Sequence, residues 1–288
     1  MILVTGASGA TGVHVIRQMA RRGASVRALS HSEAGAARVR TAGAREVATG
    51  DMRNADDVAR ALAGIDIVYH IYPALQADED SVGIRIVEQA KKAGVRRFVF
   101  HSVIRPQIEA MPYHWKKMRV EEALFASGMP YVVLQPSMYM QNIRGEWPAI
   151  VKDGVYARHY SPHRKMNVVD LDDVGEAAAI AVTEDRLDNG VFELGGPESL
   201  THAEMATILT RVLGRPVRAE GRPVADGTAA MKARGAPAYM VENFTALCHA
   251  ADALGVPGNG IVHSAIIGRK LTDFETFARK FATEMATA

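Results

Sequence analysis

A short apolar run followed by three glycines spaced three residues apart is the feature that most constrains this fold. Gly6, Gly9 and Gly12 follow the run Ile2–Thr5 and open a segment whose apolar residues recur at helical intervals. A glycine lacks a Cβ, so it permits a tight strand-to-helix turn and lets the main chain approach a bound anion. The N–H groups at the start of the new helix then face that anion. The motif therefore predicts a strand–turn–helix unit that binds the pyrophosphate of a dinucleotide.

Composition indicates a globular chain with a substantial core. The 288 residues are 48% hydrophobic and 23% charged, the formal net charge is +2, and Cys248 is the single cysteine. This length suits one α/β domain or one and a half. The basic residues are spread along the chain, which argues against a nucleic-acid or membrane surface, and no apolar run approaches the ~20 residues of a membrane span. A lone cysteine excludes an intrachain disulfide and a cysteine metal site, so we expect no metal. Residues 1–6 predict a strand rather than a signal peptide, so we expect a cytoplasmic protein.

Strand-like and helix-like segments alternate through the first half of the chain. Strands are expected at 2–5, 25–29, 46–49, 65–71, 97–101 and 131–135, and helices at 11–22, 33–42, 55–63, 81–93 and 113–126. Apolar strands joined by helical crossovers predict an α/β fold with a doubly wound parallel sheet buried on both faces. Ligands on such sheets bind outside the carboxyl ends of the strands.

The pattern changes near Trp147. Helices are expected at 170–183 and 201–213, the latter with a capping box of Thr201 and Glu204, and a strand is expected at 191–194. Residues 215–237 are rich in Pro, Gly and charge and predict a loop, and helical sequence returns from 238 and ends at 271–281. We therefore expect a dinucleotide-binding domain over 1–146 and a smaller lobe over 147–288, from which about 166–196 return to the sheet.

The end of the second expected strand distinguishes the two nicotinamide cofactors. An acidic residue there binds the ribose 2′-hydroxyl of NAD, whereas basic groups accommodate the 2′-phosphate of NADP. Ser30, His31 and Ser32 suit a phosphate, although an imidazole is only partly charged near neutral pH. The pattern favours NADP(H), Glu33 keeps NAD(H) open, and a solvated loop without a ligand is the alternative.

Two further strand ends carry candidate cofactor residues. Asp51 can accept a hydrogen bond from the adenine amino group while Met52 packs on the ring; the alternative for Asp51, a helix N-cap, suits Asn54 better. Tyr72 and Pro73 follow the fourth strand, where the nicotinamide half is expected, and plain packing is the alternative for Tyr72.

Several motifs together resemble the short-chain dehydrogenase/reductase superfamily and, within it, the atypical NmrA-like branch. They are residues 4–12, Gly50-Asp51, 93–99, 117–121, Gln135-Pro136 ahead of Gln141-Asn142, and 195–201. The resemblance covers most of the chain and implies a Rossmann domain, a small C-terminal lobe and a bound NAD(P). The branch includes quinone reductases, dye and aromatic-ether reductases, and regulators that sense the cofactor. Relatives often carry arginine where His31 stands, which weakens the NADP preference.

Tyr113 and Lys117 are spaced like the Tyr-x-x-x-Lys pair of active short-chain reductases. Four residues apart on an expected helix, they share a face, and Pro112 suits the first helical position. A nearby ammonium lowers the pKa of a phenol towards neutral, and the lysine can also hold the nicotinamide ribose. Ser102, at the end of the fifth strand, can donate to the substrate oxygen. The same spacing also arises by chance, and NmrA-like proteins often align only the lysine.

The candidate residues form three sets. The catalytic candidates are Tyr113, Lys117 and Ser102. The cofactor-binding candidates are Gly6, Ser8, Gly9, Ala10, Thr11, Gly12, Ser30, His31, Asp51, Met52, Tyr72, Pro73 and Lys117. The substrate candidates are Trp115, Met138, Tyr139 and Asn142, which suit an adaptable apolar wall, with core packing as the alternative. His159, His163 and His202 lack metal-ligand spacing and are expected on the surface.

These features together predict an NADPH-preferring reductase of a small, flat, apolar acceptor such as a quinone or conjugated carbonyl. Lys117 and Ser102 would position and polarise the acceptor, and Tyr113 would donate a proton. Two alternatives stay open: a non-catalytic sensor that binds oxidised and reduced cofactor differently, and an isomerase or epimerase that keeps its cofactor tightly bound. The sequence leaves the oligomeric state undetermined.

Overall fold

The chain divides into two compact units in the computed structural model, which describes residues 1–287. Unit 1 comprises Met1–Glu109, Tyr113–Pro136 and Leu171–Glu193. Unit 2 comprises Ala110–Pro112, Ser137–Asp170 and the described residues from Leu194 onward. Residues 137–146, expected with the nucleotide-binding part, therefore belong to unit 2, and the segment that returns to unit 1 begins at Leu171 rather than near 166.

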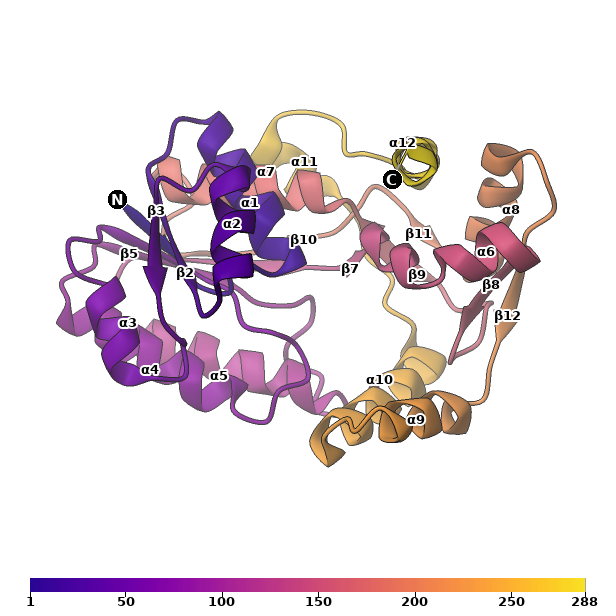
Figure 1. Cartoon of the computed structure of the whole chain (residues 1–288), viewed down its shortest axis with the longest axis horizontal. Helices are drawn as coiled ribbons and strands as arrows, with labels where there is room; N and C mark the ends of the chain where they lie inside the picture. The colour runs from indigo at the N-terminus through magenta and orange to yellow at the C-terminus, as the bar shows by residue number, and fades with distance from the viewer. Residues whose placement is uncertain (288) are drawn as a thin grey trace. The chain divides into compact units, whose positions relative to one another are not determined.

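A seven-stranded sheet forms the centre of unit 1 within the described residues, in the order β10-β6-β5-β4-β1-β2-β3 (Figure 1). The strands are β1 (Ile2–Val4), β2 (Val26–Ser30), β3 (Glu46–Thr49), β4 (Ile67–His70), β5 (Arg97–His101), β6 (Tyr131–Pro136) and β10 (Gly190–Leu194). Neighbouring strands from β6 to β3 pair in parallel. This order, in which the chain reverses direction beside β1, confirms the doubly wound parallel sheet.

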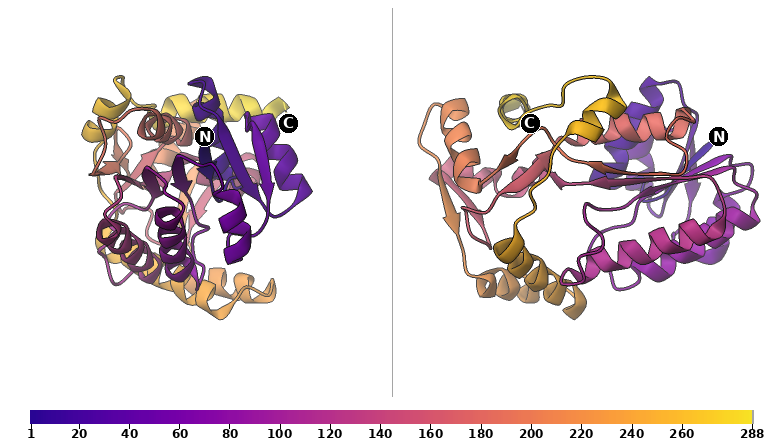
Figure 2. Two further views of the ribbon diagram at one scale, coloured as in Figure 1. Left: turned by 90° about the vertical axis from the view of Figure 1, so that its left-hand side faces the viewer. Right: turned by 180° about the vertical axis from the view of Figure 1, so that it is seen from behind.

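Helices cover both faces of this sheet. Its helices are α1 (Ala10–Arg21), α2 (Glu33–Ala42), α3 (Ala55–Ala61), α4 (Glu79–Lys92), α5 (Pro112–Ser127) and α7 (Leu171–Thr183). Helices α1, α2 and α7 lie on one face and α3, α4 and α5 on the other (Figures 1 and 2). Leu3, Val68 and Phe98 of the sheet pack with Ile86 of α4 and Val120 of α5 in one buried cluster. Burial on both faces explains why these strands are apolar without alternation.

The helix ends of unit 1 follow local rules that the sequence reveals. Asn54 caps α3 by accepting from the main-chain N–H groups of Asp56 and Asp57 at 2.9 and 3.2 Å, as expected. Pro112 is the first residue of α5, also as expected. Gly23 and Gly128, just after α1 and α5, adopt φ angles of +73° and +72°, which glycine accepts without strain.

Unit 2 contains short strands and helices. Its elements are β7 (Met138–Tyr139), the 3₁₀-helix η1 (Met140–Gly145), α6 (Trp147–Asp153), β8 (Val155–Arg158), β9 (Met166–Val169), β11 (Ser199–Leu200), α8 (His202–Leu213), β12 (Arg218–Gly221), α9 (Val224–Ala233), α10 (Ala238–Leu254), α11 (Ile261–Ile267) and α12 (Phe274–Thr287). Among the described residues, β11, β9 and β7 form one small sheet and β12 and β8 another. Thr201 and Glu204 form the predicted capping box of α8.

The predicted loop at 215–237 is wrong, because this segment contains β12 and α9. Strand β12 pairs in parallel with β8, a partner about 60 positions earlier that a local pattern does not reveal. Pro223 precedes the first turn of α9, and Gly227 inside α9 faces the rings of Phe244 and His159. Pro and Gly here serve a helix start and a close packing contact rather than a loop. The last helix also differs, since α12 begins at Phe274 and continues to Thr287.

Candidate functional site

The loop between β1 and α1 has the geometry that the glycine spacing predicts. Gly6 adopts φ +58°, and a Cβ there would lie 2.6 Å from the main-chain oxygen of Ile71. A Cβ at Gly12 would overlap the main-chain oxygens of Ala7 and Gly6. Both positions therefore require glycine, one for its dihedral angle and both for space.

The N-terminus of α1 is suited to an anion. The helix begins at Ala10, and Gly9 precedes it without offering a capping side chain. The amides of Ala10, Thr11 and Gly12 fall in the first turn, where α-helical N–H groups lack intrahelical acceptors, and the sequence of this turn contains no acidic residue. Ser8, beside this turn, is half-buried. This cradle fits a cofactor pyrophosphate.

The three residues Ser30, His31 and Ser32, at the end of β2 and just after it, have different environments. Ser30 is buried and its hydroxyl donates to the main-chain oxygen of Ser32 at 3.1 Å. The Ser32 hydroxyl caps α2 by accepting from the Gly35 N–H at 3.1 Å. His31 is exposed, and the exposed Glu33 carboxylate pairs with Arg40 at 3.0 Å. The two hydroxyls thus have local partners, and His31 extends from this loop into solvent.

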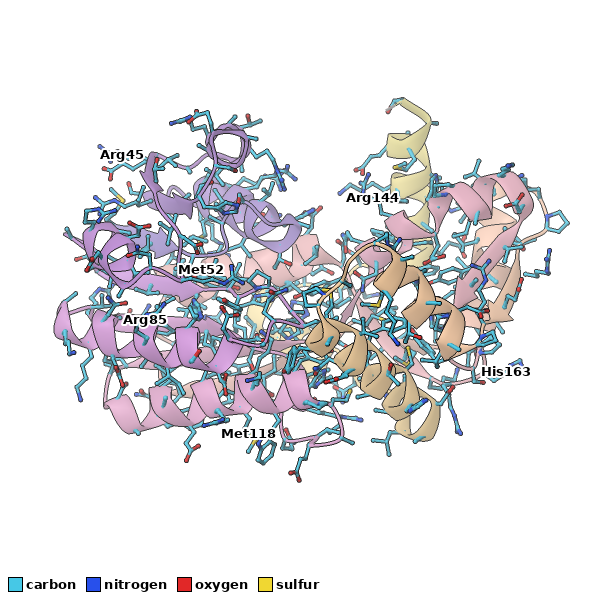
Figure 3. All side chains as sticks on the ribbon, turned by 60° about the horizontal axis from the view of Figure 1, so that its bottom comes forward. Arg45, Met52, Arg85, Met118, Arg144 and His163 are labelled. Carbon is cyan, nitrogen blue, oxygen red and sulfur yellow. The ribbon has the colours of Figure 1, made fainter. Side chains whose placement is uncertain are left out.

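The loop after β3 is tied to its neighbours by hydrogen bonds. Asp51 accepts from the Arg53 N–H at 2.9 Å, and the Asp51 N–H donates to Asp57 at 2.8 Å. Met52 is half-buried, and its main-chain oxygen accepts from Arg85 of α4 at 3.0 Å (Figure 3). The Asp51 carboxylate and the Met52 side chain are thereby presented on an ordered turn.

The loop after β4 contains a buried tyrosine and an exposed proline, Tyr72 and Pro73. The Arg53 guanidinium lies 5.6 Å from the centre of the Tyr72 ring and pairs with Asp78 at 2.7 Å. Burial raises the pKa of the Tyr72 phenol, so this group stays neutral. Arg53 and Asp78 connect the loops after β3 and β4.

Lys117 and Tyr113 have separate partners. The Lys117 side chain is 6% exposed, and its ammonium pairs with the carboxyl of Glu79 on α4, whose side chain is 1% exposed. The ammonium lies 5.8 Å from the centre of the Phe100 ring. Burial raises the pKa of Glu79, and the lysine charge opposes that rise. The Tyr113 hydroxyl lies 2.7 Å from Nε2 of His114. The ammonium therefore contacts Glu79 rather than the Tyr113 phenol.

Ser102 follows β5 and is bonded to a buried carboxyl. Its hydroxyl donates to Oε1 of Glu121 on α5. The Gln135 amide of β6 donates to the two oxygens of the same carboxyl at 3.0 and 3.1 Å. Neither Glu121 nor Glu79 is among the predicted site residues. The spacing of Lys117 and Glu121, four residues apart on one helix, is the signal that places Glu121 on the face of Lys117.

The candidate substrate residues belong to both units. Trp115 in unit 1 is half-buried, as are Met138 and Tyr139 in unit 2. The Met138 sulfur accepts from the Tyr160 hydroxyl at 3.7 Å. Asn142 in unit 2 is exposed. The half-buried side chains of Trp115, Met138 and Tyr139 are each partly packed and partly exposed. Contact with an apolar ligand requires such an exposed apolar part.

The histidines of unit 2 differ from expectation at one position. His163 is exposed and His159 half-buried, but His202 is 1% exposed, so its predicted surface placement is wrong. The rings of Tyr156 and Tyr160 pack against it at 5.1 and 5.0 Å, and burial lowers its pKa to about 3. No group of potential metal ligands occurs among residues 1–287. No helix in the same range is long and apolar enough to cross a membrane.

The sequence and the structure of this chain are similar to those of known proteins. The model of the NmrA-like family matches residues 1–278. An NAD(P)H azoreductase from Xenophilus azovorans is 28% identical over the full length of both chains. A (4-alkanoyl-5-oxo-2,5-dihydrofuran-3-yl)methyl phosphate reductase from Streptomyces griseus is 32% identical, with 82% of each chain covered. The structure of an Escherichia coli NADPH-dependent quinone oxidoreductase complexed with NADPH superposes with a TM-score of 0.85 at 23% identity, covering 98% of this chain and all of that one.

Proposed function

Because the chain belongs to the NmrA-like family, we propose that it is an NAD(P)H-dependent reductase of a small, flat, apolar acceptor such as a quinone or conjugated carbonyl. The observation that carries this proposal is the β1–α1 cradle, in which Gly6 and Gly12 leave no room for a side chain. The activities of the similar reductases from Xenophilus azovorans and Streptomyces griseus support the reaction class.

The cofactor, when bound, supplies a hydride to the acceptor. Ala10, Thr11 and Gly12 would hold the pyrophosphate through main-chain N–H groups, and His31 would meet the 2′-phosphate that distinguishes NADP(H). Asp51 and Met52 hold the adenine, and Tyr72 and Pro73 border the nicotinamide side.

The acceptor side is formed by polar and apolar groups with different tasks. The Ser102 hydroxyl donates to the acceptor oxygen, and the Lys117 ammonium favours the negative charge that develops there. Trp115, in the same unit as Ser102 and Lys117, borders the acceptor. A quinone suits such a site, because its ring delocalises the charge of the reduced product.

The test is the loss of NADPH and NADH absorbance with purified protein and a panel of quinones, enals and aromatic aldehydes. We expect protein-dependent oxidation that saturates with one acceptor class and is faster with NADPH. Lys117→Met should lower kcat/KM at least ~10-fold, because a charge near the developing oxyanion is lost. Tight binding of both cofactors without oxidation of either would contradict the proposal and favour a cofactor sensor. Cofactor that co-purifies and stays bound through turnover would favour an isomerase or epimerase.

A further inference from the structure

Glu121 is a buried carboxyl that connects two strands of the sheet in unit 1. It extends from α5 and is 4% exposed, while its partners Ser102 and Gln135 are 2% and 7% exposed. One carboxyl oxygen accepts from the Ser102 hydroxyl, and the Gln135 amide donates to both oxygens at 3.0 and 3.1 Å. A hydroxyl and an amide are neutral donors, so the contacts of this carboxyl contain no cation.

The charge of Glu121 is only partly compensated by the groups around it. Lys117, one turn earlier on α5, acts on Glu121 through its charge, but the Lys117 ammonium is paired with Glu79 of α4. His101 of β5 and His70 of β4 are buried, and burial lowers the pKa of each to about 3, so both rings are neutral. Burial raises the pKa of Glu121, opposed by the hydrogen bonds from Ser102 and Gln135 and by the lysine charge. These surroundings make the Glu121 carboxyl hold a proton more readily than an exposed glutamate does.

A protonated Glu121 changes what the Ser102 hydroxyl can do. When the carboxylate is charged, the serine proton points to Glu121. When the carboxyl carries a proton, it can donate to the serine oxygen, and the serine proton becomes available to another acceptor. Ser102 directly follows β5, at the carboxyl edge of the sheet where ligands of such folds bind.

We propose that Glu121 stores the proton that completes acceptor reduction and delivers it through the Ser102 hydroxyl, a role that rests on the proposed reductase function. The acceptor would be reduced by two electrons through the hydride that bound NAD(P)H would supply, and it would then carry an oxyanion. The O–H bond of Ser102 breaks as its proton passes to that oxyanion, and the Glu121 proton passes to the serine oxygen. Glu121 is left as a carboxylate held by Gln135, and a proton from solvent restores it before the next turnover.

The first experiment compares Glu121→Gln with Glu122→Gln, a matched control at the exposed next residue of the same helix. Glutamine keeps the size and polarity of the side chain but has no carboxyl proton to deliver. We expect Glu121→Gln to lower kcat ~100-fold and to abolish the change of kcat with pH, while KM and the NADPH dissociation constant stay within ~2-fold. Glu121→Asp, which retains a proton, should recover part of kcat.

A second readout does not depend on turnover. Infrared titration of the protein without substrate should show a carbonyl band of a protonated carboxyl that is present in wild type and Glu122→Gln and missing in Glu121→Gln. Glu121→Gln should also have no further effect on kcat in a Ser102→Ala background, because both changes interrupt one proton route.

The outcomes separate this inference from the proposed function. If wild-type protein oxidises NADPH with none of the acceptors, the reductase proposal fails and the relay fails with it. If wild type is active and Glu121→Gln behaves like Glu122→Gln, the relay alone is overturned. A kcat loss in Glu121→Gln with an unchanged pH profile and no missing infrared band would likewise overturn it, because the carboxyl would then have only a structural role.

Discussion

The edge of unit 1 that we propose binds the nucleotide (the nucleotide edge) and the edge that we propose binds the acceptor (the acceptor edge) are built in different ways. The nucleotide edge, formed by the loops after β1, β2 and β3, depends on main-chain groups and on glycines such as Gly6 and Gly12. The acceptor edge, formed by β5, α5 and β6, depends on buried ionisable side chains, among them Lys117 and Glu121.

This difference determines what each edge tolerates and what it can do. A main-chain cradle holds an anion with fixed dipoles, and its requirement is local space. Buried ionisable groups are costly unless they are paired or hydrogen-bonded, but their proton affinities shift enough to serve proton transfer. Substitutions at the nucleotide edge should therefore lower cofactor affinity, whereas substitutions at the acceptor edge should change the free energy of unfolding or the rate of turnover.

The largest effect is expected at the buried ion pair. Glu79→Gln leaves the Lys117 ammonium buried without its counter-ion and should lower the free energy of unfolding by ~3–5 kcal/mol, measured by urea denaturation. Glu33→Gln, which breaks the exposed pair with Arg40, is the control and should cost less than ~1 kcal/mol. Equal losses in the two variants would show that burial of the Lys117 pair has no energetic consequence.

A side chain added in the glycine cradle should weaken cofactor binding. Gly12→Ala places a Cβ against the main-chain oxygens of Ala7 and Gly6, so the loop must shift and NADPH affinity should fall by ~2–3 kcal/mol, or ~30–150-fold. Calorimetric titration measures this, with Gly145→Ala as the control because a Cβ there meets open space. An unchanged dissociation constant in Gly12→Ala would refute the cradle as the pyrophosphate site.

The buried His70 should make the free energy of unfolding depend on pH in the acid range. His70 is neutral in the folded chain with its pKa lowered to about 3, whereas the unfolded chain binds a proton near pH 6.5. Its stability contribution is thus complete above pH 6.5 and is lost as pH falls towards 3, at ~1.4 kcal/mol per pH unit. His70→Phe, which can keep the ring packing on Phe100, should flatten the dependence of unfolding free energy on pH by that amount.

The control for this experiment is His31→Phe, the same substitution at an exposed position of the nucleotide edge. If His70→Phe and wild type lose stability with the same slope between pH 6.5 and 4, the neutral buried histidine is not the origin of the acid sensitivity.

A smaller effect, on NADPH affinity, is expected at the exposed His31. His31→Ala should weaken NADPH binding by ~1 kcal/mol, about fivefold, without changing NADH affinity, since an exposed charge contact to a phosphate is screened by water. Fluorescence titration with the two cofactors measures both constants. Parallel weakening of NADPH and NADH would exclude a specific contact with the 2′-phosphate.

The smallest effect is expected at Tyr113. Its hydroxyl bonds to His114 while Lys117 bonds to Glu79, so Tyr113→Phe should lower kcat less than ~3-fold. Steady-state kinetics with the best acceptor measure this. A loss above ~100-fold would instead identify Tyr113 as the proton donor and argue against the route through Ser102.

Much of unit 1 could be predicted because its signals are local. The glycine spacing, the apolar strands and Asn54 as a cap of α3 each depend on a few neighbouring residues, as does the capping box of Thr201 and Glu204 in unit 2. In unit 2, β12 pairs with β8 across a long separation, and a segment rich in Pro and Gly folds into β12 and α9. Tertiary pairing overrides local composition there, which is why the predicted loop was wrong.

By itself, the amino-acid sequence determined the doubly wound sheet, the alternation of its strands with helices and a main-chain cradle at the start of α1, because main-chain geometry follows from local residue types. Only the tertiary structure decided the partners of the buried side chains. It placed Glu79 on Lys117 and brought Ser102, Glu121 and Gln135 together from β5, α5 and β6. Such contacts join residues that are distant along the chain, and the low polarity that shifts their proton affinities exists only once the core has closed around them.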